Sequence, residues 1–222
     1  PVRANIYALK SVGVGQIVAL SAVGSMKEEL SPLDLVIPDQ IIDRTKGRQT
    51  TFFEAGIVAH IGFADPFCSE LSMVAFNAAC AEGINTHHGG TYLAIEGPQF
   101  STRAESDMYR SWGASVIGMT ALPEAKLARE AEICYTTLAF VTDYDVWRSS
   151  EDDVSVEMVL GNLKRNAGAA QRIIARVAMD VPSHRGCICG SALKDAIITD
   201  PGTISAASIE RLGILVKNYL AN

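Results

Sequence analysis

The sequence lacks any long uninterrupted apolar run. Hydrophobic residues fill 48% of its 222 positions, but no apolar stretch approaches the roughly 20 residues with which a helix crosses a bilayer. No secretory signal peptide is recognisable at the start, where the first residue is Pro1 and not Met. Five cysteines, an odd number, without such a signal favour a reducing compartment. We therefore expect a cytoplasmic protein with no membrane partner.

Clusters of basic residues are also absent. The 19 Lys and Arg residues are outnumbered by 25 Asp and Glu residues, which gives a net charge of −6, and no stripe rich in Lys or Arg occurs. Nucleic-acid binding usually needs such a stripe, so we expect no nucleic-acid partner. A small anionic substrate stays open, because a few backbone N–H groups can outweigh the global charge locally.

Several catalytic motifs are missing too. The chain has no G-x-S-x-G, H-E-x-x-H or Walker loop. Its four histidines, at positions 60, 87, 88 and 184, show no helical metal-ligand spacing. His184 with Cys187 and Cys189 raises the question of zinc, but these three residues have no fourth ligand in sight. An internal disulfide or two free thiols suits the cysteine pair better, and we expect no metal.

Short apolar strands alternate with longer helical patterns along the chain. This order is typical of a layered α/β sheet, and 222 residues suit a single domain. Strands are expected at residues 16–20, 34–38, 40–42, 90–95, 115–117 and 134–142. Helices are expected at residues 4–12, 70–81, 102–112, 123–131, 155–178 and 205–219, with 43–66 and 182–202 irregular.

Asp143, Tyr144 and Asp145 follow the strand expected at 134–142. Side chains alternate along an extended chain, so both carboxylates would face one spot just past the strand, where open α/β sheets bind ligands. Two carboxylates in a partly dry site repel each other, and one of them can keep its proton near neutral pH. A protonated Asp can donate a hydrogen bond to a base nitrogen. Two solvated loop acids, or a metal-binding D-x-D, are the alternatives.

Three other expected strands also end in small or polar residues. These clusters are residues 21–25, with the sequence SAVGS, residues 96–101, with the sequence EGPQFS, and Met119 with Thr120. Strand ends of this fold class converge on one crevice, so the four clusters together predict a site. Residues 21–25 offer a phosphate cradle of backbone N–H groups, or form a tight turn into a helix. Thr120 adds a hydroxyl to the same anion, or caps the helix that begins near Pro123.

Two apolar features have equally open interpretations. Phe100 is a stacking surface for a planar base, with Ser101 as a polar contact at its edge, or it belongs to the core. Val156, Val159 and Leu160 share one face of the helix expected at 155–178. That face packs in the core or lines an apolar pocket.

Together these motifs resemble the family of 5′-methylthioadenosine phosphorylases, in the trimeric purine nucleoside phosphorylase superfamily. The resemblance is carried by AHIGFADPFC (59–68), IEGPQFSTRAES (95–106), VIGMTALPE (116–124) and AFVTDYDVW (139–147). It implies an α/β fold with three αβα layers around a twisted mixed central sheet. The implied activity is phosphorolysis of 5′-methylthioadenosine to adenine and 5-methylthioribose 1-phosphate, in purine and methionine salvage.

The resemblance also implies roles at the phosphate and ribose. Phosphate would be the co-substrate, with no other cofactor, and its contacts would be Ser21, Ala22 and Thr120. Met119 would lie along the ribose. Val156, Val159 and Leu160 would line the pocket for the 5′-methylthio group. His60 would reach that pocket from a neighbouring subunit, in a homotrimer or a dimer of trimers.

Around the adenine the resemblance places Phe100, Ser101, Asp143 and Asp145. We expect Asp143 to donate a proton to N7 of the base, with Asp145 raising the pKa of Asp143 and helping to bind the 6-amino group. The 6-oxopurine members of the superfamily have Asn where Asp143 stands. The Asp pair therefore resembles the members that accept 6-aminopurines.

One departure from the family concerns the start of the chain. The family opens with a strand and a glycine-rich loop, followed by an Arg-His pair, and this sequence begins after these phosphate-binding elements. We therefore expect an N-terminally truncated domain whose 222 residues do not complete the phosphate site alone. The alternatives are an adenosine or inosine phosphorylase of the same superfamily, a non-catalytic purine-binding fragment, and a nucleoside hydrolase.

Overall fold

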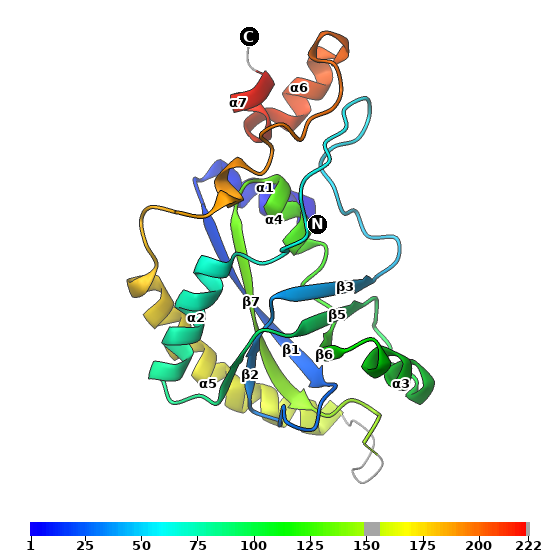
Figure 1. The fold of residues 1–222 in the computed structure, drawn as a ribbon, viewed down its shortest axis with the longest axis vertical. Helices are drawn as coiled ribbons and strands as arrows, with labels where there is room; N and C mark the ends of the chain where they lie inside the picture. Colours follow the sequence, from blue (N-terminus) through cyan, green and yellow to red (C-terminus); the bar gives the residue numbers. More distant parts are fainter. Residues whose placement is uncertain (149–155, 221–222) are drawn as a thin grey trace.

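A mixed sheet of seven strands forms the centre of the computed structural model, which describes residues 1–148 and 156–220 (Figure 1). The strand order is β3-β5-β6-β1-β7-β2-β4. The strands are β1 (Gln16–Ser25), β2 (Leu35–Ile37), β3 (Gln40–Arg44), β4 (Thr86–His88), β5 (Thr91–Ile95), β6 (Ala114–Gly118) and β7 (Cys134–Asp143).

The parallel pair of β1 and β7 lies in the middle of this sheet. Its register runs from Gln16 opposite Cys134 to Gly24 opposite Asp143, with an irregularity after Val23. Every residue of β7 is buried, because helices cover the strand on both faces.

Five helices cover the two faces of the sheet. On one face, α2 (Ser69–Ala81) and α5 (Val156–Asp180) lie side by side against β7 (Figure 1). On the other, α1 (Val2–Ser11) packs on α4 (Glu124–Glu130), which contacts β7. The fifth helix, α3 (Arg103–Ser111), packs on β6. The expected α/β class, with a mixed sheet between helical layers, is confirmed.

Successive residues of β7 serve the opposite layers. Leu138 and Phe140 pack with Ile173 of α5 in the cluster beneath α2 and α5. Ala139 and Val141 belong to the larger cluster that includes α1 and α4. A strand's side chains alternate between faces, so this strand connects both halves of the core.

The expected elements are confirmed over most of the chain. The strands near 34–42, 90–95, 115–117 and 134–142 are present, as are the helices expected between residues 4 and 178. The spacing of Thr102 and Glu105 forms a complete capping box at the start of α3.

Two features of the structure depart from the expected elements, which include no strand around His87. The residues around His87 form the short strand β4, because the backbone of 86–88 pairs with β2 from a distant part of the chain. The helix expected at 205–219 is divided into α6 (Ala206–Leu212) and α7 (Lys217–Leu220). Gly213 has a φ of +48°, which a right-handed helix cannot continue through.

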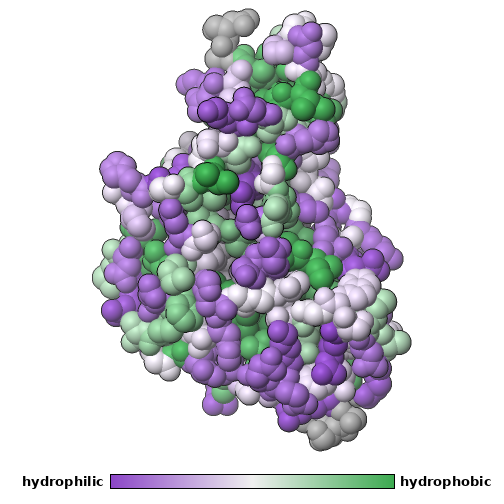
Figure 2. Space-filling model, viewed as in Figure 1, coloured by the Kyte–Doolittle hydropathy of each residue, from purple (hydrophilic) through white to green (hydrophobic). Residues whose placement is uncertain are grey.

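The C-terminal helices stand at one end of the molecule, beyond the sheet (Figure 1). They are held by Leu212, Leu215 and Val216, which share a core cluster with Phe52 and Ile57. Figure 2 shows hydrophobic residues exposed in small separate groups on this face, one of them near these helices. Among the described residues, no helix combines the length and hydropathy required of a membrane span.

Adjacent isoleucines of α5 test the packing of this layer. Ile173 is 0% exposed and Ile174 is 39% exposed. We expect Ile173→Ala to lower the free energy of unfolding by about 2–5 kcal/mol, because it leaves a cavity against β7. Ile174→Ala removes the same atoms from a partly solvated site and should cost less than about 1 kcal/mol. Urea unfolding measures both changes, and equal losses would contradict the assigned packing.

Candidate active site

A cavity of about 260 Å³ opens where β1 and β6 separate. These strands are antiparallel, and in the described chain only Gly24 and Ser25 of β1 pair with β6. The cavity gathers nine of the residues singled out in the sequence. They are Ser21, Ala22, Phe100, Ser101, Met119, Thr120, Asp143, Asp145 and Val159.

The way these strands meet differs from the expected crevice. β1 is parallel to β7, and β5 is parallel to β6, but the two pairs run in opposite directions. The four strand ends therefore do not share one edge of a parallel sheet. The two pairs overlap near their carboxyl ends, and the cavity lies at that overlap.

Residues 21–25 are also not the loop that was expected. They continue β1 to Ser25, with Ser21 opposite Ala139 and Ala22 opposite Phe140 of β7. Backbone N–H groups used in this ladder cannot serve as a free anion cradle. Small side chains are still required here, since a Cβ on Gly24 would lie 2.9 Å from Oδ1 of Asp143.

The two carboxylates come together through a turn. Asp143 ends β7, and Asp145 has a φ of +53°, in the left-handed region. Strand alternation is therefore not what pairs them. Oδ1 of Asp143 accepts a hydrogen bond from the backbone N–H of Asp145 at 2.9 Å, and Oδ2 accepts one from the Thr142 hydroxyl at 2.6 Å. Oδ2 of Asp145 accepts a hydrogen bond from the Ser106 hydroxyl.

Burial raises the pKa of both carboxyl groups. Asp143 is 7% exposed, and its burial outweighs the hydrogen bonds from Thr142 and Asp145, which lower its pKa. Burial is also the largest cause for Asp145, opposed by hydrogen bonds from Ser106 and Val146, and the charge of Asp143 raises the pKa of Asp145 further. Desolvation is the largest cause at both carboxyl groups, and the repulsion between their two charges, which acts on both, adds to it.

Three hydroxyl groups meet at one end of the cavity. The Ser21 hydroxyl lies 2.9 Å from that of Tyr92 and 3.0 Å from that of Thr120. Tyr92 on β5 was not singled out in the sequence, because a strand tyrosine is usually a core residue. Its position beside Ser21 depends on how β5, β6 and β1 are arranged. The group offers hydrogen-bond donors without a formal charge.

Phe100 and Ser101 are both placed for contact with a ligand. Phe100 is 50% exposed and lines the cavity, so it is not the core residue of the alternative interpretation. The Ser101 hydroxyl is buried and has no hydrogen-bond partner among the described residues. A buried hydroxyl without a partner loses free energy, and a ligand atom in this cavity would supply the missing bond.

The residues expected to form an apolar pocket are divided. Val159 lines the cavity, whereas Leu160 is 49% exposed and does not. Val156 begins α5, but its side chain lies outside the described part of the structure. His60 is exposed and is not part of the cavity lining in this subunit. Its backbone N–H donates a hydrogen bond to the carbonyl of Ala196 at 2.8 Å.

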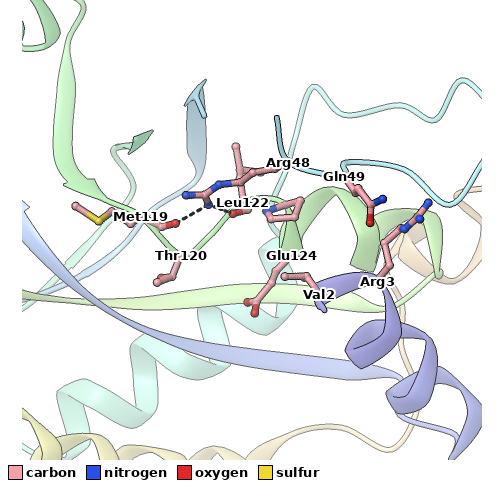
Figure 3. Close-up of a pocket in the computed structure, with 9 residues that line it drawn as sticks. Val2, Arg3, Arg48, Gln49, Met119, Thr120, Leu122 and Glu124 are labelled. Carbon is pink, nitrogen blue, oxygen red and sulfur yellow. Dashed lines mark hydrogen bonds between the residues drawn. The ribbon is translucent and has the colours of Figure 1, made fainter. Parts of the chain in front are cut away.

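A second cavity of about 440 Å³ adjoins the first at Met119 and Thr120 (Figure 3). Arg48 holds this loop, because its guanidinium donates hydrogen bonds to the carbonyl oxygens of Met119 and Leu122. It also donates to Oε2 of Glu96 at 2.9 Å. Arg48 was not singled out in the sequence, since a lone Arg in an irregular segment gives no local signal. It fixes the loop that carries Thr120 into the first cavity.

The family is shown by comparison with known proteins. The sequence model of the phosphorylase superfamily matches residues 1–178. The chain belongs to the phosphorylase superfamily. Within this superfamily, the S-methyl-5'-thioadenosine phosphorylase of Geobacter sulfurreducens is 54% identical over 219 residues, which are 98% of this chain and 77% of that protein. The enzyme of the same name from Thermosynechococcus vestitus is 54% identical over 224 residues, covering 99% of this chain and 78% of its own length.

Solved structures of phosphorylases agree with this result. A methylthioadenosine phosphorylase from an antarctic soil metagenomic library superposes with a TM-score of 0.91 at 50% identity, covering 97% of this chain and 76% of its own. The methylthioadenosine phosphorylase of Schistosoma mansoni in complex with adenine gives a TM-score of 0.84 at 31% identity, covering 89% of this chain and 78% of its own. This chain is therefore a phosphorylase-superfamily member whose relatives include methylthioadenosine phosphorylases.

The raised pKa of Asp143 predicts a pH-dependent stability. A carboxyl that binds its proton more tightly when folded adds stability below its unfolded pKa of about 3.9, and this stability is lost as the pH rises through the folded value. Asp143→Asn removes this titration. The measured quantity is the Tm of the variant minus the Tm of the unmodified protein. We expect this difference to rise between about pH 4 and about pH 8, because only the unmodified protein loses this stability.

The control for this measurement is Asp107→Asn, at an exposed carboxyl on α3. Its Tm difference from the unmodified protein should change little with pH, because this side chain is exposed and lies outside the cavity lining. Scanning calorimetry at several pH values measures both differences. A flat or falling difference for Asp143→Asn would rule out a raised pKa at this position.

Proposed function

We propose that this protein catalyses the phosphorolysis of 5′-methylthioadenosine to adenine and 5-methylthioribose 1-phosphate. The proposal rests on one observation above all. The buried Asp143 and the half-buried Asp145 lie together in the same cavity as the half-exposed ring of Phe100, in a chain of the phosphorylase superfamily. Inorganic phosphate is the co-substrate and no further cofactor takes part. Residues 1–222 act as a single domain.

The base is held by contacts on its face and edge. Phe100 stacks on the purine, since an exposed aromatic ring beside an open cavity gives a planar ligand a large apolar surface. The Ser101 hydroxyl, which is buried without a partner, bonds to the edge of the base. Asp145, oriented by Ser106, accepts a hydrogen bond from the 6-amino group. A purine with an oxygen at this position would place two acceptors against each other.

Proton donation from Asp143 lets the base depart as a neutral molecule. Adenine is a poor leaving group as an anion, so N7 must gain a proton as the bond between C1′ and N9 breaks. Burial keeps the carboxyl of Asp143 protonated to a higher pH than in water. The electron pair of the C1′–N9 bond moves into the purine, and the Asp143 proton is transferred to N7.

Phosphate attacks C1′ from the face opposite the base. Ser21 and Thr120, whose hydroxyl groups are 3.0 Å apart, bind its oxygens, and Ala22 contacts it from the same part of the cavity lining. Its negative charge stabilises the oxocarbenium character that develops on the ribose. Met119 packs along that ribose. Arg48 acts through its bonds to the Met119 and Leu122 carbonyls, which position Thr120.

The 5′-methylthio group occupies the apolar side of the cavity. Val159 lines that side, and we assign Val156 and Leu160, from the start of the same helix, to it as well. His60 of the neighbouring subunit reaches the same pocket, so the active form is a homotrimer or a dimer of trimers. The enzyme works in the cytoplasm, where it serves purine and methionine salvage.

Replacement of Asp143 tests the assigned proton donor. We expect Asp143→Asn to lower kcat on 5′-methylthioadenosine by about 10²–10⁴-fold, because an amide cannot transfer a proton to N7. The variant should lose less activity on inosine than on 5′-methylthioadenosine. Release of base from the complete gene product, followed by absorbance, measures both activities. The exposed Asp107→Asn serves as the matched control and should leave both unchanged.

Three results would contradict the proposed reaction. Full activity of Asp143→Asn on 5′-methylthioadenosine would remove the proton donor. Release of adenine at the same rate without phosphate would identify a hydrolase. Calorimetric binding of adenine without any phosphate-dependent release, again in the complete gene product, would leave a purine-binding module.

Replacement of Val159 tests the apolar pocket. We expect Val159→Ser to lower kcat/KM for 5′-methylthioadenosine by about 10-fold or more, because the methylthio group loses apolar contacts and meets a hydroxyl. The value for adenosine, whose 5′-hydroxyl is polar, should fall less. Leu163→Ser, at an exposed position of the same helix, is the control. Equal losses on both nucleosides would place the methylthio group elsewhere.

A further inference from the structure

Four of the five cysteines converge at one point of the described structure. The sulfur atoms of Cys68, Cys134, Cys187 and Cys189 all lie within 4.8 Å of one another. Cys187 is half-buried, the other three are buried, and all four are free thiols. The sequence showed no fourth ligand beside Cys187 and Cys189, because Cys68 and Cys134 come from distant segments. His184, which was weighed as a ligand, is exposed and is not part of this cluster.

We propose that these four thiols form a structural zinc site with tetrahedral tetrathiolate coordination. A Zn–S bond of about 2.3 Å places the sulfurs of such a site about 3.8 Å apart. The separation of 3.3 Å between the Cys134 and Cys187 sulfurs, and the upper limit of 4.8 Å for all pairs, lie on either side of that value. Side-chain shifts of about 1 Å close the site around the ion.

Two cations near the cluster suit a metal complex, although Asp39, Asp65 and Glu70 line the same cavity. Binding of Zn²⁺ releases the four thiol protons to solvent and leaves a complex with two negative charges. Two arginines lie close by. Nη1 of Arg185 is 4.0 Å from the Cys134 sulfur, and Arg129, only 7% exposed, lines one cavity with Cys68, Cys187 and Cys189. Two disulfides are neutral and require no such cations.

The position of the cluster explains what the metal does. Cys68 directly precedes α2 and Cys134 begins β7. Cys187 and Cys189 lie in the segment after α5, where Arg185 already donates hydrogen bonds to the carbonyl oxygens of Gly15 and Glu132. The Gly186 N–H donates to Oε2 of Glu70 at 3.1 Å, which brings this segment to α2. One ion bound to all four sulfurs would connect this segment to α2 and to β7.

The site is separate from the proposed reaction. Cys134 begins β7 and Asp143 ends it, so the two sites lie at opposite ends of a strand about 30 Å long. Loss of zinc should therefore lower the thermal stability before it changes the chemistry at the active site. The metal content can be measured without any assay of activity, so the two proposals fail independently.

Metal analysis of the purified protein tests this proposal. The protein is prepared with a reductant and without a metal-affinity tag, and its zinc and iron are measured by inductively coupled plasma mass spectrometry. We expect about one zinc ion per chain. Cys68→Ser, Cys134→Ser, Cys187→Ser and Cys189→Ser should each reduce zinc at least tenfold in the folded fraction and lower the Tm. Cys80→Ser, at an exposed cysteine outside the cluster, should do neither.

Cobalt substitution gives a second measurement that needs no variant to fold. The metal-free protein titrated with Co²⁺ should show the intense visible absorption and the sulfur-to-metal charge-transfer band of a tetrahedral tetrathiolate site, reaching a plateau at about one ion per chain. Four reactive thiols with no bound metal would overturn the proposal. Disulfides among the four cysteines in a non-reducing peptide map, or iron in place of zinc, would do so as well.

Discussion

The burial of Asp143 at the end of the central strand pair is the constraint on which the site depends. β1 and β7 remain paired up to Gly24 and Asp143, so the carboxyl group is carried into the protein by the strand itself. Gly24 leaves the space that the carboxylate fills. Helical layers exclude water from both faces of β7, and the resulting loss of hydration raises the pKa of Asp143.

The two halves of the sheet run in opposite directions, and the cavity beside this carboxyl group lies where they meet. A fully parallel sheet would continue its ladder across β1 and β6 and leave no gap inside. Here the pairing of β1 with β6 is limited to the segment at Gly24 and Ser25. The remaining backbone diverges, and the strand ends of both halves supply the lining. Hydroxyl groups from Ser21, Tyr92 and Thr120 therefore meet although they belong to separate strands or loops.

The two ends of β7 carry different chemistry on one rigid element. Its carboxyl end supplies the buried acid, and its amino end supplies a thiol to the cysteine cluster. Buried polar groups are costly unless they have partners. At Asp143 the partners are Thr142 and the backbone of Asp145, and around the cysteines they are other thiols and Arg185. The Asp143 carboxyl and the Cys134 thiol are therefore both held in fixed positions by β7.

The sequence by itself determined the α/β class, most helices and strands, and nine residues of the cavity lining. Local patterns carry that information, because apolar periodicity and capping residues act over a few positions. Only the tertiary structure decided that residues 21–25 extend a strand and that Asp143 owes its raised pKa to burial. It also placed Tyr92 and Arg48 at the candidate active site, and it brought Cys68 and Cys134 close to Cys187 and Cys189. These features depend on contacts between segments far apart in the chain, and no local pattern records such contacts.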